Sequence, residues 1–178
     1  MKCATNLFLI AMLCLSLNGC SNLETGIAET KVPSEVEQKN AQKNASIQNK
    51  KDILSEDYAT AEKALKKSVL EKNKDITKLG LKSPILDIRK KTAEAIAKTA
   101  EKTFVPNLIE ALEQNQGIIG GGSEIQSLQN ELNETIISAL EQLTKLKFKV
   151  SESLSPEDIQ KILKESREWW KIHQGKDK

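Results

Sequence analysis

The side chains that most often carry chemistry are scarce in this chain of 178 residues. There is one histidine, His173, and there are three cysteines, Cys3, Cys14 and Cys20. No serine lies in the Gly-x-Ser-x-Gly turn that exposes a nucleophile, and no base is available for a triad. A metal site needs several ligands at suitable spacing, and His173 has no second His or Cys near it. The sequence therefore predicts that the protein is not an enzyme and binds no metal.

Two further features have simpler explanations than a catalytic or ligand-binding site. Gly120-Gly121-Gly122-Ser123 precedes an expected helix, whose free N–H groups could hold an anion. There is no preceding strand and no Gly-Lys-Ser/Thr, so a loop beside a binding surface is expected instead of a phosphate site. Glu157 and Asp158 form an acidic pair, but they fall in the first turn of an expected helix, where the helix dipole explains them.

Cys20 has the most informative surroundings of the three cysteines. Lys2 supplies a positive charge, and residues 7–15 form an apolar run that is too short to cross about 30 Å of hydrocarbon. This layout is typical of a secretory signal peptide, which is removed from the mature chain. The run is followed by Leu17, Asn18 and Gly19, directly before Cys20.

The four residues Leu17-Asn18-Gly19-Cys20 resemble the lipobox of bacterial lipoproteins, although Asn18 is larger than the Ala or Ser usual there. The resemblance implies that residues 1–19 are removed, that the Cys20 sulfur takes a diacylglycerol group, and that the new amino group is acylated, for example by palmitate. This covalent lipid would be the only prosthetic group. Two or three acyl chains make such anchoring stable, because a single chain binds membranes only marginally. The alternative is an ordinary secreted protein cut near Gly19.

The resemblance also implies a location in the cell envelope. Ser21 follows the cysteine, and in Gram-negative lipoproteins a residue other than Asp at this place favours the outer membrane, on its periplasmic side. Cys3 and Cys14 would leave with the signal peptide, so Cys20 would be the only cysteine of the mature chain. We therefore expect neither a disulfide nor a nucleophilic thiol in the mature protein.

The overall composition favours helices. The chain has 27 Lys and Arg against 25 Asp and Glu, a near balance that argues against a nucleic-acid-binding protein. Aromatic residues make up 3% of the chain, and Ala, Glu, Lys, Leu and Ile are abundant, which favours an all-α fold over a β-sandwich. The lysines are expected to form a solvated face, with a weak attraction to anionic lipid headgroups as a further possibility.

The helices that would position any functional site are expected to follow a polar segment. Residues 20–54 are poor in large apolar side chains and are expected to form the lipidated end and a disordered tether with a random-coil span of about 30 Å. A weak amphipathic helix around Val32–Ile47 is the alternative. Residues 55–174 are expected to form a domain of about five helices, and residues 175–178 a disordered tail.

Helix signals recur through the expected domain. Ser55 resembles an N-cap, Ser83-Pro84 and Ser155-Pro156 resemble helix starts, and Ser123–Gln126 fits a capping box. Apolar residues at helical spacing follow each start. The clearest examples are Tyr58, Ala61, Leu65, Val69 and Ile76 in the first helix, and Ile125, Leu128, Leu132, Ile136, Ala139, Leu140, Leu143 and Leu146 in the fourth.

The segment 85–112 resembles HEAT repeats. It combines Asp87-Ile88-Arg89 and an Ala-rich helix face with a following Val105-Pro106-Asn107-Leu108, and a similar apolar pattern recurs about 44 residues later, within the range of HEAT periods. The second unit has Asn133 where the first has Arg89. The resemblance implies a short HEAT-like solenoid, and an irregular antiparallel helical bundle is the alternative.

Trp169 and Trp170 lie on adjacent positions of the last expected helix and therefore point about 100° apart. One is expected to cap the stack of helices, and the other to lie at the edge, where it could contact a partner protein. Together these features predict a membrane-anchored, non-catalytic lipoprotein whose body acts as a protein–protein interaction module for an envelope partner. An apolar groove that carries a lipid or other hydrophobic ligand is the alternative function.

Overall fold

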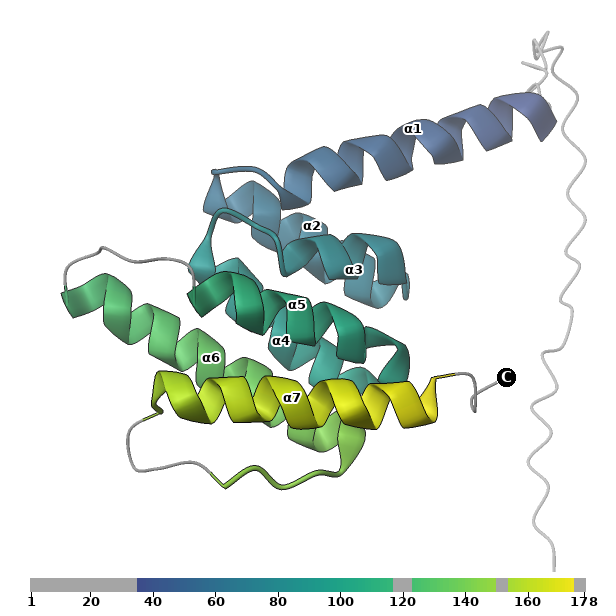
Figure 1. The fold of residues 1–178 in the computed structure, drawn as a ribbon. Coiled ribbons are helices and arrows are strands. Elements are labelled where there is room, and N and C mark those ends of the chain that lie inside the picture. Colours follow the sequence, from purple (N-terminus) through teal and green to yellow (C-terminus); the bar gives the residue numbers. More distant parts are fainter. Residues whose placement is uncertain (1–34, 117–122, 150–153, 175–178) are drawn as a thin grey trace, which may run out of the picture. The chain divides into compact units, whose positions relative to one another are not determined.

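The computed structural model describes residues 35–116, 123–149 and 154–174. These ranges hold seven α-helices, one 3-10 helix and no strand, which confirms the predicted all-α class (Figure 1). The predicted signal peptide, residues 20–34 of the predicted tether and the predicted tail lie outside the described residues. The helices are α1 (Glu35–Ile53), α2 (Tyr58–Leu70), α3 (Lys74–Gly80), α4 (Leu86–Thr99), η1 (Lys102–Phe104), α5 (Val105–Gln116), α6 (Ser123–Thr144) and α7 (Pro156–His173).

The helices of the unit Glu35–Lys178 are stacked in two layers (Figure 1). In one layer α2 packs against α4, and α4 packs against α6. In the other layer α1 packs against α3, and α5 packs against α7. The two layers are joined by contacts within three successive pairs, α1 with α2, α3 with α4, and α5 with α6. The result is a stack of helix pairs that α7 completes.

Two groups of buried apolar side chains hold the stack together. The larger one fills the space among α4, α5, α6 and α7 and includes Ile96, Leu108, Leu112, Ile136 and Leu140, which are fully buried. The smaller one joins α1, α2, α3 and the start of α4. It comprises Ile53, Ala61, Ala64, Leu65, Ile76 and Ile88.

Side-chain caps explain where several helices begin. The Asp57 carboxylate accepts a hydrogen bond from the Thr60 N–H and caps α2, so the cap lies two residues beyond the predicted Ser55. Ser155 and Asp158 form a reciprocal capping box at the start of α7, where a helix start is predicted. The structure begins α4 at Leu86, two residues after the predicted start at Pro84.

The prediction of a disordered tether up to residue 54 is wrong for residues 35–53, which form α1. This helix carries no apolar stripe, and among its side chains whose burial the structure describes, Asn49 and Ile53, near its C-terminal end, are buried. Ile53 is fully buried against α2 and α3. The alternative prediction, a weak amphipathic helix around Val32–Ile47, overlaps α1 from Glu35 onward, but the contact that holds this helix is made at its C-terminal end and not through an apolar stripe.

The predicted first helix is also divided in two. Lys72 has a φ of 53°, and Asn73 accepts a hydrogen bond from the Ile76 N–H, so the chain stops after α2 and starts again as α3. The expected apolar face is therefore shared between two helices. Ala61, Leu65 and Ile76 are buried as predicted, whereas Tyr58 and Val69 remain exposed.

Candidate functional site

The predicted lipidation site cannot be placed within the fold. Leu17, Asn18, Gly19 and Cys20 lie outside the described residues, as do Gly120–Gly122. No helix of the described part of the chain is both long enough and apolar enough to cross a membrane. The same residues contain no group of three or more His, Cys, Asp or Glu side chains arranged to hold a metal ion.

The two tryptophans lie near the C-terminal end of α7. Both are half-buried and pack against the larger core group, so the expected division into one packed and one free indole is not seen. The Trp169 ring stacks on the ring of His173, with centroids 4.1 Å apart. The Nδ1 atom of His173 also lies 2.8 Å from the Trp169 carbonyl oxygen, near the negative end of the helix dipole. The stacked rings of Trp169 and His173 therefore hold each other in position in the last turn of α7.

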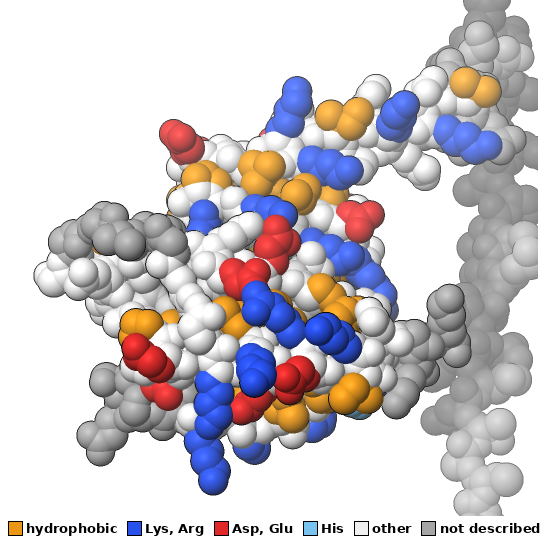
Figure 2. Space-filling model, viewed as in Figure 1, with side chains coloured by type: hydrophobic (Ala, Val, Ile, Leu, Met, Phe, Trp, Pro, Cys, Tyr) orange, Lys and Arg blue, Asp and Glu red, His pale blue; other side chains and the backbone are white. Residues whose placement is uncertain are grey.

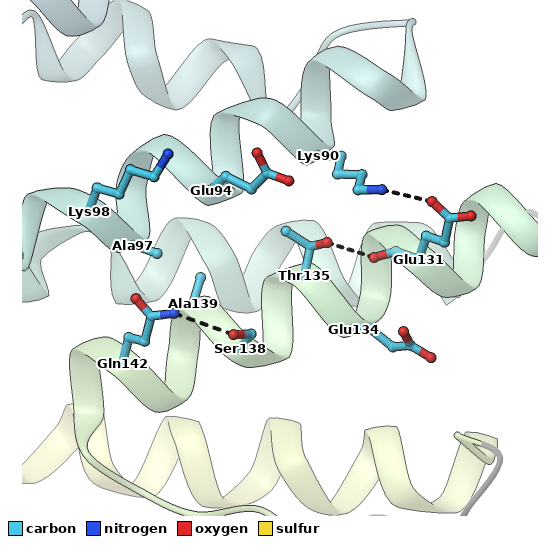
Figure 3. Close-up of a pocket in the computed structure, with 10 residues that line it drawn as sticks. All are labelled: Lys90, Glu94, Ala97, Lys98, Glu131, Glu134, Thr135, Ser138, Ala139 and Gln142. Carbon is cyan, nitrogen blue, oxygen red and sulfur yellow. Dashed lines mark hydrogen bonds and ion pairs between the residues drawn. The ribbon is translucent and has the colours of Figure 1, made fainter.

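A hollow of about 420 Å³ lies between α4 and α6 (Figure 3). Its small side chains come from both helices and include Ala97, Ser138 and Ala139, which leave room between the two backbones. Longer polar side chains surround them. The remaining lining residues are Lys90, Glu94, Lys98, Glu131, Glu134, Thr135 and Gln142.

Part of this α4–α6 hollow is held in place by its own hydrogen bonds. The Lys90 ammonium lies 2.7 Å from a Glu131 carboxylate oxygen, and this contact raises the pKa of Lys90 (Figure 3). Lys98 and Glu134 make no ion pair within the described residues. The hollow therefore presents both positively and negatively charged side chains to a ligand. The Lys90–Glu131 ion pair links the two helices, α4 and α6, that form it.

A second hollow, of about 490 Å³, lies between α2 and α4. Its apolar lining comes from Leu65, Val69 and Leu70 of α2 and Ala95 of α4, and Glu94 lines both hollows. The two hollows thus adjoin along α4. Together they form the α2–α4–α6 face, the candidate binding surface of the protein.

An ion-pair cluster joins α2 to α4 beside the second hollow. The Lys91 ammonium lies 2.8 Å from a Glu62 oxygen and 3.3 Å from an Asp87 oxygen, and it contacts the hydroxyl of Tyr58. Lys66 lies 3.1 Å from Glu62. Hydrogen bonds from Lys91 and then Lys66 lower the pKa of Glu62 to about 2, while the same contact raises the pKa of Lys91. The cluster fixes how the two helices lie beside the hollow.

The opposite layer has a different surface. In Figure 2 positive and negative side chains alternate over α5 and α7, with isolated hydrophobic side chains among them. Several polar contacts across this layer are already made within the protein. Arg167 of α7 pairs with Glu113 of α5, Lys82 lies 2.7 Å from Glu110, and Gln160 donates to Gln116 at 2.8 Å.

Sequence reasoning did not find the α2–α4–α6 face. Its residues come from three helices that are far apart in the chain, and they form no motif. The signal that could have pointed to it is the Ala-rich run of α4, which includes Ala95 and Ala97. That run predicts close helix approach, and the hollows lie where these small side chains reach the surface.

Comparison with known proteins adds no relative from which a site could be transferred. No family model, no curated protein and no solved structure matches the chain.

Proposed function

We propose that the protein is a bacterial envelope lipoprotein, anchored through lipid on Cys20, whose HEAT-like helical body binds another envelope protein and catalyses no reaction. The observation that carries the proposal is the sequence Leu17-Asn18-Gly19-Cys20 at the end of a short apolar run. A lipid at this position would hold the body close to one membrane for the life of the protein. In a Gram-negative host, Ser21 favours the periplasmic side of the outer membrane.

The α2–α4–α6 face supports the binding role. Stacked helix pairs present extended surfaces to partners, and here one such surface contains two adjoining hollows. The α4–α6 hollow suits a protein segment that carries hydrogen-bonding side chains of both charge signs, because Lys98 and Glu134 are available for new ion pairs. Ala97 and Ala139 allow the backbone of that segment to approach closely.

The anchoring is tested by the substitution Cys20→Ser in the full-length chain. We expect the variant to leave the membrane fraction and the wild-type protein to stay there after washing at high salt. Cys14→Ser is the matched control, because that cysteine lies within the predicted signal peptide and is expected to have no role in anchoring. A Cys20→Ser protein that remains in the membrane fraction contradicts the proposal.

The partner is tested by photo-crosslinking in cells. A photoreactive amino acid at the exposed Ser138, in the α4–α6 hollow, is expected to capture one envelope protein reproducibly. The same amino acid at the exposed Lys164, on α7 in the opposite layer, is the control and is expected to capture it far less. Equal capture from both positions, or none from either, counts against a binding role for this face.

The apolar lining of the α2–α4 hollow favours one second candidate, an envelope lipoprotein that carries a hydrophobic small molecule. Leu65, Val69 and Leu70 supply the surface that such a ligand needs. Native mass spectrometry after mild extraction distinguishes the two functions. A copurifying ligand that is lost in the variant Val69→Glu supports the carrier function, and its absence from the wild-type protein removes that function.

A further inference from the structure

The outer side of α2 carries an unusual set of side chains. The buried residues of this helix, Ala61, Ala64, Leu65 and Ser68, follow the i, i+3, i+4, i+7 spacing of one helix face. Two positions further along, the same spacing places a second set on the opposite side of the helix, where it is exposed. This second set, the α2 outer stripe, consists of Lys63, Lys66, Lys67 and Leu70.

Leu70 stands out within this stripe. It is 84% exposed, more than any other large hydrophobic side chain in the described part of the chain. It sits at the last position of α2, just before the backbone turns at Lys72, and the residues that the structure describes leave most of it uncovered. Val69 beside it is also exposed and lines the α2–α4 hollow. Burying Leu70 against something outside the described fold would therefore remove apolar surface from water.

The charge around Leu70 is predominantly positive. The acid within α2, Glu62, is already engaged by Lys91 and Lys66. Lys63, Lys67 and Lys72 make no ion pair with any residue that the structure describes. Two further acids lie near Leu70, namely Glu71, which adjoins it in the sequence, and Glu94 of α4, which lines the same hollow. The exposed leucine is thus flanked by lysines whose ammonium groups are available to an anionic surface.

The tether places this stripe within reach of a membrane, and this step rests on the proposed function. Residues 21–34 connect Cys20 to α1, and fully extended they reach about 50 Å, at roughly 3.3–3.6 Å per residue. A chain held so close to the bilayer has a high effective concentration at its surface, so contacts too weak to bind a free protein are sufficient.

We propose that the α2 outer stripe lies on the anionic lipid surface of the membrane that holds Cys20, with Leu70 entering the headgroup region and Lys63 and Lys67 facing lipid phosphates. Lysines near an anionic bilayer are attracted to it, and an apolar side chain between them adds burial. A protein interface fits less well, because lysine is depleted at such interfaces. The α4–α6 hollow, on the other end of the same layer, remains open to a protein partner.

The test uses the mature lipidated protein in vesicles, with a polarity-sensitive fluorophore on a new cysteine. Since Cys20 is the only cysteine of the predicted mature chain and its sulfur would be alkylated, Leu70→Cys provides one reactive thiol. The vesicles are either phosphatidylcholine alone or rich in phosphatidylglycerol. We expect a blue shift and quenching by lipid-borne quenchers at position 70 in the anionic vesicles, both lost in high salt. The variant Lys164→Cys, on α7, is the matched control and is expected to remain in water.

Each outcome is decisive. Reversing charge with Lys63→Glu and Lys67→Glu is expected to reduce the quenching several-fold while the protein stays with the vesicles. An anchored protein whose label at 70 stays in water on anionic vesicles overturns this inference and leaves the proposed function intact. If the label at position 70 is shielded from water in native envelopes but not in protein-free vesicles, the stripe binds a protein partner. That result also overturns this inference. Absence of lipid on Cys20 overturns the proposed function, and this inference with it.

Discussion

Gly80, the last residue of α3, lies directly against Thr92 of α4. A β-carbon added at Gly80 would come within 2.3 Å of the Thr92 Oγ1 atom, far inside contact distance. Thr92 is fully buried, and its hydroxyl donates a hydrogen bond to the Ile88 carbonyl oxygen at 2.6 Å. The absence of a side chain at Gly80 therefore sets how closely α3 approaches α4.

We therefore predict that Gly80→Ala lowers the free energy of unfolding by about 1–3 kcal/mol, the usual cost of overpacking. Urea denaturation followed by circular dichroism measures the change. The double variant Gly80→Ala/Thr92→Ala provides the control, because removing the Thr92 hydroxyl and methyl groups opens the space. Its loss of stability should be smaller than the sum of the two single losses. Additive losses would contradict the predicted clash.

Leu132 and Leu128 test how the layers are packed. Both lie on α6 one turn apart, but Leu132 is 1% exposed and Leu128 is 45% exposed. We predict that Leu132→Ala destabilises the protein by about 2–5 kcal/mol, as large cavities in cores do. Leu128→Ala, the matched control, should cost under about 1 kcal/mol. Equal losses in thermal unfolding would mean that the first turns of α6 are also buried.

The same two leucines show how far the sequence could predict this fold. The predicted apolar stripe has one periodicity from Ile125 to Leu146, and it predicts α6 and most of its buried face, but the helix ends at Thr144, where Lys145 turns with a φ of 63°, so Leu146 lies beyond it. The stripe does not reveal that Ile125 and Leu128 remain exposed. Which turns of a stripe are covered depends on where the neighbouring helices end, and no local pattern contains that information.

Helix α1 and the candidate site were harder to predict for related reasons. The sequence of α1 is mostly polar and has no apolar stripe, and the contact that holds it is made through Asn49 and Ile53 with helices that follow later in the chain. The α4–α6 hollow depends on pairing between residues 90–98 and 131–142. Such pairing is a property of the tertiary structure, whereas the resemblance of Leu17-Asn18-Gly19-Cys20 to a lipobox depends only on neighbouring residues of the sequence.

A buried amide pair joins α5 to α6. The Asn115 amide donates to the Asn133 side-chain oxygen at 2.7 Å and to the Gln129 carbonyl oxygen at 3.0 Å. Asn115 and Asn133 are both buried, so removing the Asn133 side chain leaves the Asn115 amide with one of its two acceptors, the Gln129 carbonyl oxygen. We predict that Asn133→Ala costs about 1–3 kcal/mol in chemical denaturation. Asn130→Ala, at an exposed position of the same helix, is the control, and an equal effect there would argue against the pair.

The Glu62–Lys91 ion pair predicts a pH dependence of stability. The pKa of Glu62 is lowered from 4.5 to about 2, first by Lys91 and then by Lys66. Because the unfolded chain binds this proton more readily, the stabilisation is present above about pH 4.5 and is lost as the pH falls towards 2. Glu62→Gln should therefore flatten the curve of stability against pH in this acid window. The measurement is urea denaturation at a series of pH values.

Glu134→Gln is the control for this pH dependence, because Glu134 is exposed and makes no ion pair within the described residues. High salt should reduce the difference between the wild-type protein and Glu62→Gln, since the pair is near the surface. If Glu62→Gln and the wild-type protein lose stability in parallel between pH 4.5 and 2, the Glu62 carboxylate is not held by Lys91 in solution.

The central claim is that the mature protein starts at Cys20 and carries lipid there, and the intact mass of the protein purified from membranes tests it most directly. We predict a chain that lacks residues 1–19 and is heavier than its sequence by a diacylglycerol group and an N-linked acyl chain, with the added mass confined to the N-terminal peptide. A mass equal to that of an unmodified chain, or one that retains residues 1–19, would contradict the claim.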